Sequence, residues 1–251
     1  MTTVRVLRAG FSPLKGTRHL ALPEVRLDEL GAVGDRSLCL VDVAAARVLR
    51  TVQHPQLTAV VARLDAGSRL LDVTLPDGRT ASAVPTASGE RLTCDYWGRP
   101  TEVDLLDGPH GGLFSDHLGK PVALARAPRL GVVYGAGVSI IARASLEELG
   151  ARVDAEVDPA RFRATLVVDA GDEPYAEEAW TGRELRVGET VLRIGEPIPR
   201  CAVIDIDPHT GERHGRLLRT LAGYRPLNDV GEPCFGVYAE VRTPGVVAVD
   251  G

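Results

Sequence analysis

Short β-forming runs broken by turn residues constrain the fold of this chain more than any other feature. Glycine, proline and aspartate separate the runs, as in Pro76-Asp77-Gly78. Many short strands at this spacing are typical of barrels and sandwiches rather than of parallel βαβ winding, so we expect a mainly β protein of the α+β class. The expected strands are residues 4–7, 37–41, 57–64, 70–75, 102–106, 122–125, 138–142, 166–169, 185–187, 190–194, 202–206 and 236–241.

Helices are few in this pattern. The clearest covers residues 145–150, where Ser145 and Glu148 form a capping box and Gly150 ends the helix. Two more are expected at residues 175–180 and 217–224. Residues 108–112 are rich in glycine and predict a flexible loop. This loop divides the chain into two predicted domains, residues 1–108 and 109–251.

Composition excludes several classes of function. The chain has 251 residues, of which 44% are hydrophobic and 25% charged, as in soluble globular proteins. A net charge of -5 without a Lys/Arg-rich run argues against a nucleic-acid partner. We see no signal peptide and no segment of about 20 apolar residues that would cross a bilayer. The scattered cysteines, Cys39, Cys94, Cys201 and Cys234, predict no disulfide framework, and we expect a cytoplasmic protein with reduced thiols.

Arg200 and Cys201 place a guanidinium beside a thiol, just before an apolar run. A neighbouring positive charge favours the thiolate, which attacks electrophiles and binds soft metals. Free cysteine also packs as a small hydrophobe, so a purely structural role is equally compatible with these residues.

Other basic residues stand at turns. Lys15 and Arg36 lie beside glycines, and Arg161 and Arg163 flank Phe162. Each alone is typical of a solvated surface charge, but together in one cleft they would bind a phosphate. Similarly, Ser145 is suited to cap its helix and to contribute to an anion site at the helix N-terminus, and one role does not exclude the other.

Three other combinations of residues are weak evidence for a catalytic or binding site. Ser115, Asp116 and His117 have the residue types of a catalytic triad, but adjacency in sequence is not triad geometry. Cys201 with His209 and His214 matches no zinc spacing. The glycines of residues 131–137 do not form the dinucleotide-binding fingerprint.

The order of motifs resembles a known family. In the N-terminal half, residues 12–16 are similar to its Tyr-Pro-Val-Lys-Ser segment and residues 31–36 to its Gly-x-x-Gly-Asp-Arg strand entry. The family is MOSC, in its two-part members, to which the mitochondrial amidoxime-reducing component and its bacterial relatives belong. The resemblance covers nearly the whole chain and implies a β-barrel MOSC domain packed with an N-terminal β-barrel-like region. The further matching segments are residues 53–57, 96–98, 118–121, 144–146, 161–163, 176–180, 200–201, 207–211, 218–225, 235–238 and 244–245.

This resemblance implies a molybdenum cofactor of the molybdopterin type. Cys201 would be a direct ligand of the metal and the catalytic residue. The pterin phosphate would meet Lys15, Arg36 and Arg163, while the helix start at Ser145 borders the cofactor. The implied cofactor-binding residues are Lys15, Arg36, Ser145, Arg163, Thr165, Arg200 and Tyr238.

Three positions depart from the family pattern. Thr165 replaces an asparagine that contacts the cofactor, and a threonine hydroxyl has fewer donors than an amide. Val52 replaces an arginine, although Arg50 is close by. Arg143 stands where the family often has an acidic residue.

The function implied is a molybdenum-dependent oxidoreductase that reduces N-oxygenated small molecules such as amidoximes, hydroxylamines or N-oxides. The chain has no flavin fingerprint, haem motif or iron–sulfur cysteine cluster. Electrons are therefore expected from a separate redox protein. Two alternatives stay open: a sulfur carrier that uses a persulfide on Cys201, and a cofactor-free MOSC binding module. Pyridoxal phosphate binding is implied only by an association of the family with that cofactor.

Overall fold

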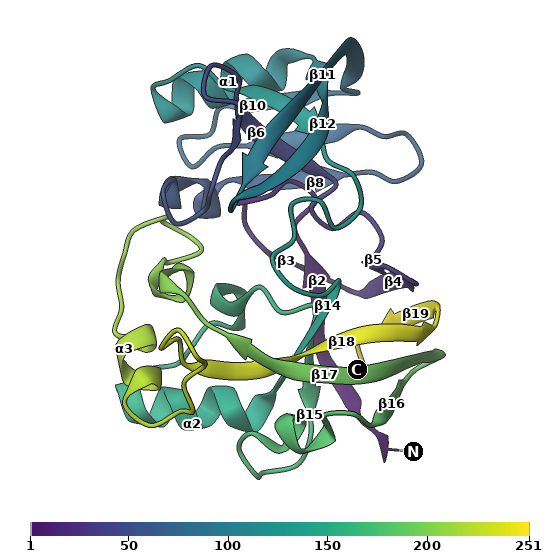
Figure 1. Cartoon of the computed structure of the whole chain (residues 1–251), viewed down its shortest axis with the longest axis vertical. Helices are drawn as coiled ribbons and strands as arrows, with labels where there is room; N and C mark the ends of the chain where they lie inside the picture. Colours follow the sequence, from purple (N-terminus) through teal and green to yellow (C-terminus); the bar gives the residue numbers. More distant parts are fainter. Residues whose placement is uncertain (1, 251) are drawn as a thin grey trace.

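The computed structural model describes residues 2–250, which form an upper and a lower part (Figure 1). The upper part contains a closed barrel, and the lower part a broad twisted sheet. The predicted mainly β fold with few helices is confirmed. None of the helices within residues 2–250 is long and apolar enough to span a membrane.

The upper part combines the barrel with a three-stranded antiparallel sheet. In one strand of that sheet, buried Leu71 and Val73 alternate with exposed Asp72 and Thr74, which gives the strand one apolar face. Leu71 and Val73 pack into the core of this part. The barrel strands are β6 (Leu38–Asp42), β7 (Arg47–Val48), β11 (Thr86–Tyr96), β12 (Arg99–Asp107) and β13 (Ala123–Arg126); the sheet strands are β8 (Val61–Leu64), β9 (Leu71–Thr74) and β10 (Thr80–Ala83).

The predicted flexible loop at residues 108–112 is wrong, because α1 (Pro109–Leu118) begins there. Proline suits the first helical position, since its missing N–H would have no partner there. The helix buries His110 and Phe114, and Phe114 packs into the upper core. Burial of this face outweighs the poor helix propensity of the two adjoining glycines.

The lower part is an eight-stranded sheet in the order β1-β16-β17-β18-β14-β15-β2-β3. Three of its strands come from the chain start: β1 pairs with β16, β2 pairs with β15, and β3 pairs with β2. The division at residues 108 and 109 stays a prediction. A small sheet joins the chain end to β4. The strands are β1 (Thr2–Thr3), β2 (Arg5–Phe11), β3 (Leu20–Leu22), β14 (Val138–Ala142), β15 (Leu166–Asp169), β16 (Glu184–Val187), β17 (Thr190–Pro199) and β18 (Cys234–Thr243), with β4 (Glu24–Asp28), β5 (Gly31–Ala32) and β19 (Gly245–Ala248) in the small sheet.

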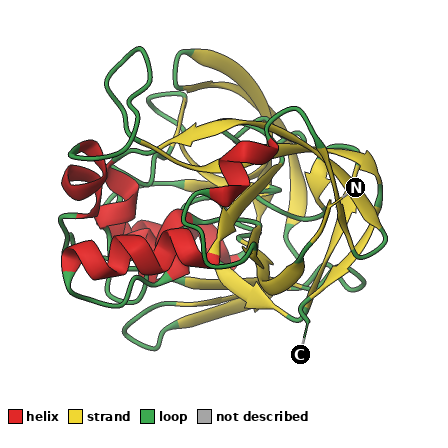
Figure 2. Cartoon of the chain, turned by 90° about the horizontal axis from the view of Figure 1, so that it is seen from below, coloured by secondary structure: helices red, strands yellow, loops and turns green. Residues whose placement is uncertain are grey.

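Helices gather on one side of the molecule, and strands fill the other (Figure 2). Helical residues Leu149, Ile204 and Leu221 share one core with the stacked rings of Phe162 and Phe235, whose centroids are 4.7 Å apart. The remaining helical elements are α2 (Arg143–Val153) and α3 (Leu217–Ala222), with the 3-10 helices η1 (Pro55–Ala59), η2 (Pro159–Phe162), η3 (Ala176–Trp180) and η4 (Ala202–Asp205).

Two predicted strands are corrected. Residues 57–64 divide into the end of η1 and strand β8. Of residues 202–206, the first four form η4 rather than a strand. The chain turns after Cys201, with the Ile204 amide donating to the Cys201 carbonyl at 3.3 Å. This turn directs Ile204 into the core with Leu217 and Leu221. Tertiary packing therefore overrides the β propensity of the run.

The predicted capping box is also wrong. Helix α2 begins at Arg143 with Ala142 at its N-cap, so Ser145 lies within the first turn. A buried carboxylate from another element takes the capping role, since the Ala142 amide donates to Glu177 Oε1 at 3.1 Å. Glu148 instead pairs with Arg152 along the helix.

Candidate functional site

A cavity of about 230 Å³ lies where the upper and lower parts meet. Loops from both parts line it, together with the ends of β11, β17 and η2. It brings together six of the eight residues predicted for the site, which come from distant positions in the chain. These six are Lys15, Arg36, Arg163, Arg200, Cys201 and Tyr238.

Cys201 stands at the wall of this cavity with an exposed side chain. Strand β17 ends at Pro199, which has no N–H to continue the ladder. The next residue is still tied to the sheet edge, because the Arg200 amide donates to the Pro233 carbonyl at 2.9 Å. Cys201 therefore follows a fixed strand end and keeps its thiol accessible.

Arg200, the residue before Cys201, is buried, with 7% of its surface exposed. Its Nε donates to the Phe235 carbonyl at 2.8 Å, and Nη1 donates to the Phe162 carbonyl at 3.0 Å. Burial lowers the pKa of this guanidinium to about 10, so it remains charged at neutral pH. The structure thus fixes a positive charge next to Cys201, as the adjacency in sequence indicated.

Lys15, Arg36 and Arg163 form the cationic wall of the cavity. Asp35 pairs with Arg36 through Nε at 2.8 Å. Arg163 donates to the Thr17 carbonyl at 2.8 Å and to Ser12 Oγ at 2.7 Å. Both arginines have left-handed backbones, with φ of 46° and 54°, so sharp turns aim these two guanidinium groups.

Lys15 is the most perturbed cation of this wall. Its ammonium lies 4.7 Å from the centroid of the Tyr96 ring. Burial, and then the charges of Arg36 and Arg163, lower the pKa of Lys15 to about 7. Its charge therefore changes near neutral pH.

This titration predicts a pH-dependent affinity for anions. Below pH 7 Lys15 is protonated and attracts an anion, whereas above pH 7 it is neutral. We expect the affinity for sulfate, whose own charge is constant, to fall about fivefold between pH 6 and pH 8. Isothermal titration measures this change. The Lys15→Gln variant should bind more weakly with a flatter pH profile, and an equally steep profile in that variant would contradict the assignment.

Several lining residues were not predicted. Arg50 reaches the cavity beside Val52, with its guanidinium 4.3 Å from the Trp97 ring centroid and 3.0 Å from Asp95. Exposed Trp97 and Tyr134 form an edge-to-face pair at 6.1 Å. Arg50 is close to Val52 in the sequence, but nothing in the sequence places the aromatic pair beside it.

Two predicted residues are not among those that line the cavity. The Ser145 hydroxyl is buried and donates to Glu177 at 2.9 Å and 3.0 Å. Thr165 lies one layer behind the wall: its hydroxyl accepts from the Ser139 amide at 3.1 Å, and Ser139 lines the cavity. Thr165 therefore contacts a residue that lines the cavity, not the cavity itself.

Unpartnered donors indicate what kind of group this cavity fits. Among the described residues, Arg50 Nε, Arg161 Nη1 and Arg200 Nη2 are buried without a hydrogen-bond partner, and all three arginines line the cavity. Buried donors without partners are costly, so such positions are typical of sites that bind a ligand. Guanidinium groups with a nearby exposed thiol fit an anionic group that carries a soft metal.

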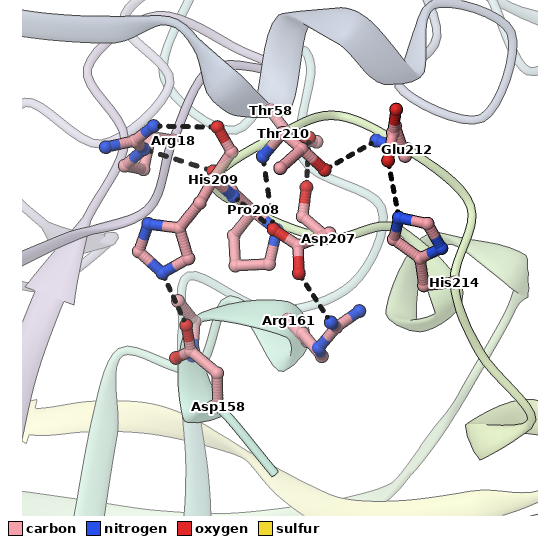
Figure 3. A network of polar contacts seen from close by, with 11 residues as sticks. Arg18, Thr58, Asp158, Arg161, Asp207, Pro208, His209, Thr210, Glu212 and His214 are labelled. Carbon is pink, nitrogen blue, oxygen red and sulfur yellow. Dashed lines mark hydrogen bonds and ion pairs between the residues drawn. The ribbon is translucent and has the colours of Figure 1, made fainter.

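Hydrogen bonds and an ion pair connect the loop that follows Cys201 to the residues around it (Figure 3). Arg161 pairs with Asp207 at 2.9 Å, and the Thr58 hydroxyl donates to the Asp207 carbonyl at 3.2 Å. His209 and His214 pair with carboxylates of Asp158 and Glu212 rather than with Cys201. Within residues 2–250 no cluster of three or more His, Cys, Asp or Glu side chains is arranged to hold a metal.

Arg18 is the main link between this loop and the upper part. Its Nε donates to the Pro208 carbonyl at 3.1 Å, and its Nη2 donates to the carbonyls of Ala59 at 2.9 Å and His209 at 3.3 Å. Without these hydrogen bonds, the free energy needed to open the loop should fall by about 1–2 kcal/mol.

We therefore expect Arg18→Ala to raise the rate of trypsin cleavage after Arg213 or Arg216 about tenfold. Fragment masses over a time course measure this rate. Arg79→Ala serves as the control, because Arg79 pairs only with exposed Asp77 in a distant hairpin. Equal cleavage of both variants would show that Arg18 does not hold the loop.

The fold and the site define a mainly β protein with a cationic, thiol-bearing cavity between its two parts. The MOSC domain family matches residues 116–251, more than half of the chain, and the chain belongs to this family.

Named relatives agree with this membership. The chain is 27% identical to the molybdenum cofactor sulfurase of Drosophila grimshawi over 250 residues, which cover 93% of this chain and 32% of that protein. It is 33% identical to mitochondrial amidoxime-reducing component 1 of Mus musculus over 118 residues, 44% of this chain and 34% of that protein. The chain thus spans about a third of the length of these relatives. The crystal structure of the YUAD protein from Bacillus subtilis aligns with a TM-score of 0.45 at 11% identity, covering 98% of this chain and 91% of that one.

Proposed function

We propose that this chain is a molybdenum-cofactor-dependent oxidoreductase that reduces N-oxygenated small molecules. The observation that carries the proposal is the presence of the exposed Cys201 thiol in one cavity with arginines that hold buried, unpartnered donors. Buried donors without partners are costly, and an anionic ligand that accepted from these three would remove that cost. The named relatives, which concern a molybdenum cofactor and amidoxime reduction, support the same class of chemistry.

In this proposal different residues of the cavity hold different parts of the cofactor. Cys201 provides a soft thiolate ligand for the metal. Arg200 and Arg161 would offer N–H groups to anionic oxygens, and Lys15, Arg36 and Arg163 would hold the phosphate. When bound, the molybdenum supplies a two-electron redox centre.

The chain itself would orient the substrate and exclude water. The Phe162 and Phe235 carbonyls fix Arg200, so its free N–H does not have to reorganise during the reaction. Trp97 and Tyr134 flank the mouth with apolar surface, and Tyr238 closes the wall beside Gly135. Any side chain at position 135 would collide with the Tyr238 ring, because a Cβ there would lie 2.2 Å from the ring.

The reaction balances as a two-electron, two-proton reduction: R–C(NH₂)=N–OH + 2 e⁻ + 2 H⁺ gives R–C(NH₂)=NH + H₂O. The N–O bond breaks, the oxygen leaves as water, and the electrons come from a separate redox protein. Reduction of benzamidoxime with reduced methyl viologen as electron donor tests the proposal. Protein from a host that makes the cofactor should form benzamidine. No product from metal-loaded, folded protein would contradict it.

A sulfur carrier is the second candidate, favoured by the accessibility of Cys201. That role requires only a reactive thiol and a docking surface. Mass spectrometry after incubation with a cysteine desulfurase would then find a sulfane-sulfur adduct on Cys201 in metal-free protein. A cofactor-free binding module and the family association with pyridoxal phosphate stay predictions.

A further inference from the structure

Glu232 is the single carboxylate among the described residues that line the cationic cavity. Together with Arg200 and Cys201 it also lines a second, more open hollow on the side of η4 and α3. Cys201 and Glu232 therefore stand on the boundary between the two spaces. A molecule that enters through the open hollow meets both side chains.

A tight turn holds this carboxylate in place. The Asn228 side chain donates to Glu232 Oε2 at 3.1 Å, and its Oδ1 accepts from the Glu232 amide at 2.8 Å. A bridge between Leu227 and Pro233 closes the turn, and the Pro233 carbonyl accepts the Arg200 amide. The turn is thus fastened to the residue that precedes Cys201.

The charge of Glu232 is not neutralised within the described part of the chain. Its side chain is half-buried, yet it forms no ion pair there, although the cavity wall holds several arginines. Its hydrogen bond to Asn228 occupies one carboxylate oxygen and leaves the other free. A fixed, unpaired carboxylate attracts cations and N–H donors, and repels anions.

The cofactor of the proposed function would bind at the cationic wall. The ligand that is left to contact the Glu232 carboxylate is then the substrate. The free carboxylate oxygen is a strong acceptor for an N–H group, such as that of the amino group in an amidoxime or an amidinium cation. An N-oxide without N–H groups offers no such partner.

Resting on the proposed function, we infer that Glu232 orients and selects substrates of the amidine type, namely amidoximes and N-hydroxyguanidines. Its free carboxylate oxygen accepts an N–H of the amino group on the amidoxime carbon and places the N–O bond towards Cys201. Reduction of an amidoxime yields an amidine that takes up a further proton to become a cation. The carboxylate therefore binds this product more strongly than a neutral one.

Benzamidine, the cationic product, provides a test that does not depend on turnover. We expect wild-type protein to bind it, and Glu232→Gln to bind it at least about tenfold more weakly, as for one lost charge-assisted pair. Titration calorimetry measures both affinities. Glu212→Gln is the matched control, because Glu212 is exposed and pairs with His214 away from both spaces. Equal affinity in wild type and Glu232→Gln, or no binding to wild type, overturns the inference.

Turnover separates this inference from the proposed function. With reduced methyl viologen, Glu232→Gln should raise the KM for benzamidoxime about tenfold with little change in kcat, and leave reduction of pyridine N-oxide unchanged. A variant that loses both substrates equally contradicts selection by Glu232. If wild type reduces neither substrate, the proposed function fails while the benzamidine result still decides the role of Glu232 in binding.

Discussion

Replacing Cys201 by alanine should lower amidoxime reduction at least about 10³-fold while the chain stays folded. The thiol is exposed and follows a strand end held by the Arg200 amide, so its loss leaves no cavity in the core. Alanine is preferred to serine, since a hydroxyl oxygen is itself able to bind metals. Turnover with an artificial electron donor and circular dichroism measure the two properties.

Cys234 gives the matched control. It pairs with Pro199 across β17 and β18, close in the fold to Cys201, and burial raises the pKa of its thiol. Cys234→Ala should keep turnover within about threefold of wild type. Retention of activity in Cys201→Ala would exclude the thiol as a metal ligand.

Arg200→Met should reduce molybdenum retention about 10- to 100-fold, as found for groups that support metal ligands. The free Nη2 donor is lost, and so is the charge behind the thiol. The free energy of unfolding should fall by only about 1–2 kcal/mol, because two effects oppose each other. The Phe162 and Phe235 carbonyls lose donors, but the cost of burying a charge disappears.

Arg225→Met is the control for this variant. Arg225 is also well buried, donates to the Cys234 carbonyl at 3.1 Å and pairs with Glu178, but it does not line the cavity. Its loss leaves Glu178 unpaired, so stability should fall more than in Arg200→Met while metal retention changes little. Chemical denaturation and metal analysis compare the variants. The opposite ranking would assign Arg200 to stability alone.

Most strands were predictable because alternation along a strand is a local signal, as at Leu71 and Val73. The errors fall where distant packing decides. Burial of Phe114 stabilises a helix that contains two glycines, and Ile204 packs into the core against Leu217. The capping box failed because Glu177, from another element, caps α2 instead.

The sequence predicted those parts of the site in which the chemistry of a single residue type, or of two neighbours in sequence, is informative. Arg200 beside Cys201 was visible directly, and resemblance supplied Lys15 and Arg163. The arrangement of Trp97 and Glu232 around them was not, because it depends on turns that converge only in the folded chain. Ser145 shows the reverse case: a residue with suitable chemistry whose hydroxyl is bound by Glu177.

Metal content tests the central claim most directly. The full chain, purified from a host that makes the molybdenum cofactor, should contain about one molybdenum per chain by elemental analysis, and Cys201→Ala should contain almost none. Folded wild-type protein without molybdenum, or equal molybdenum in the two proteins, would contradict the account.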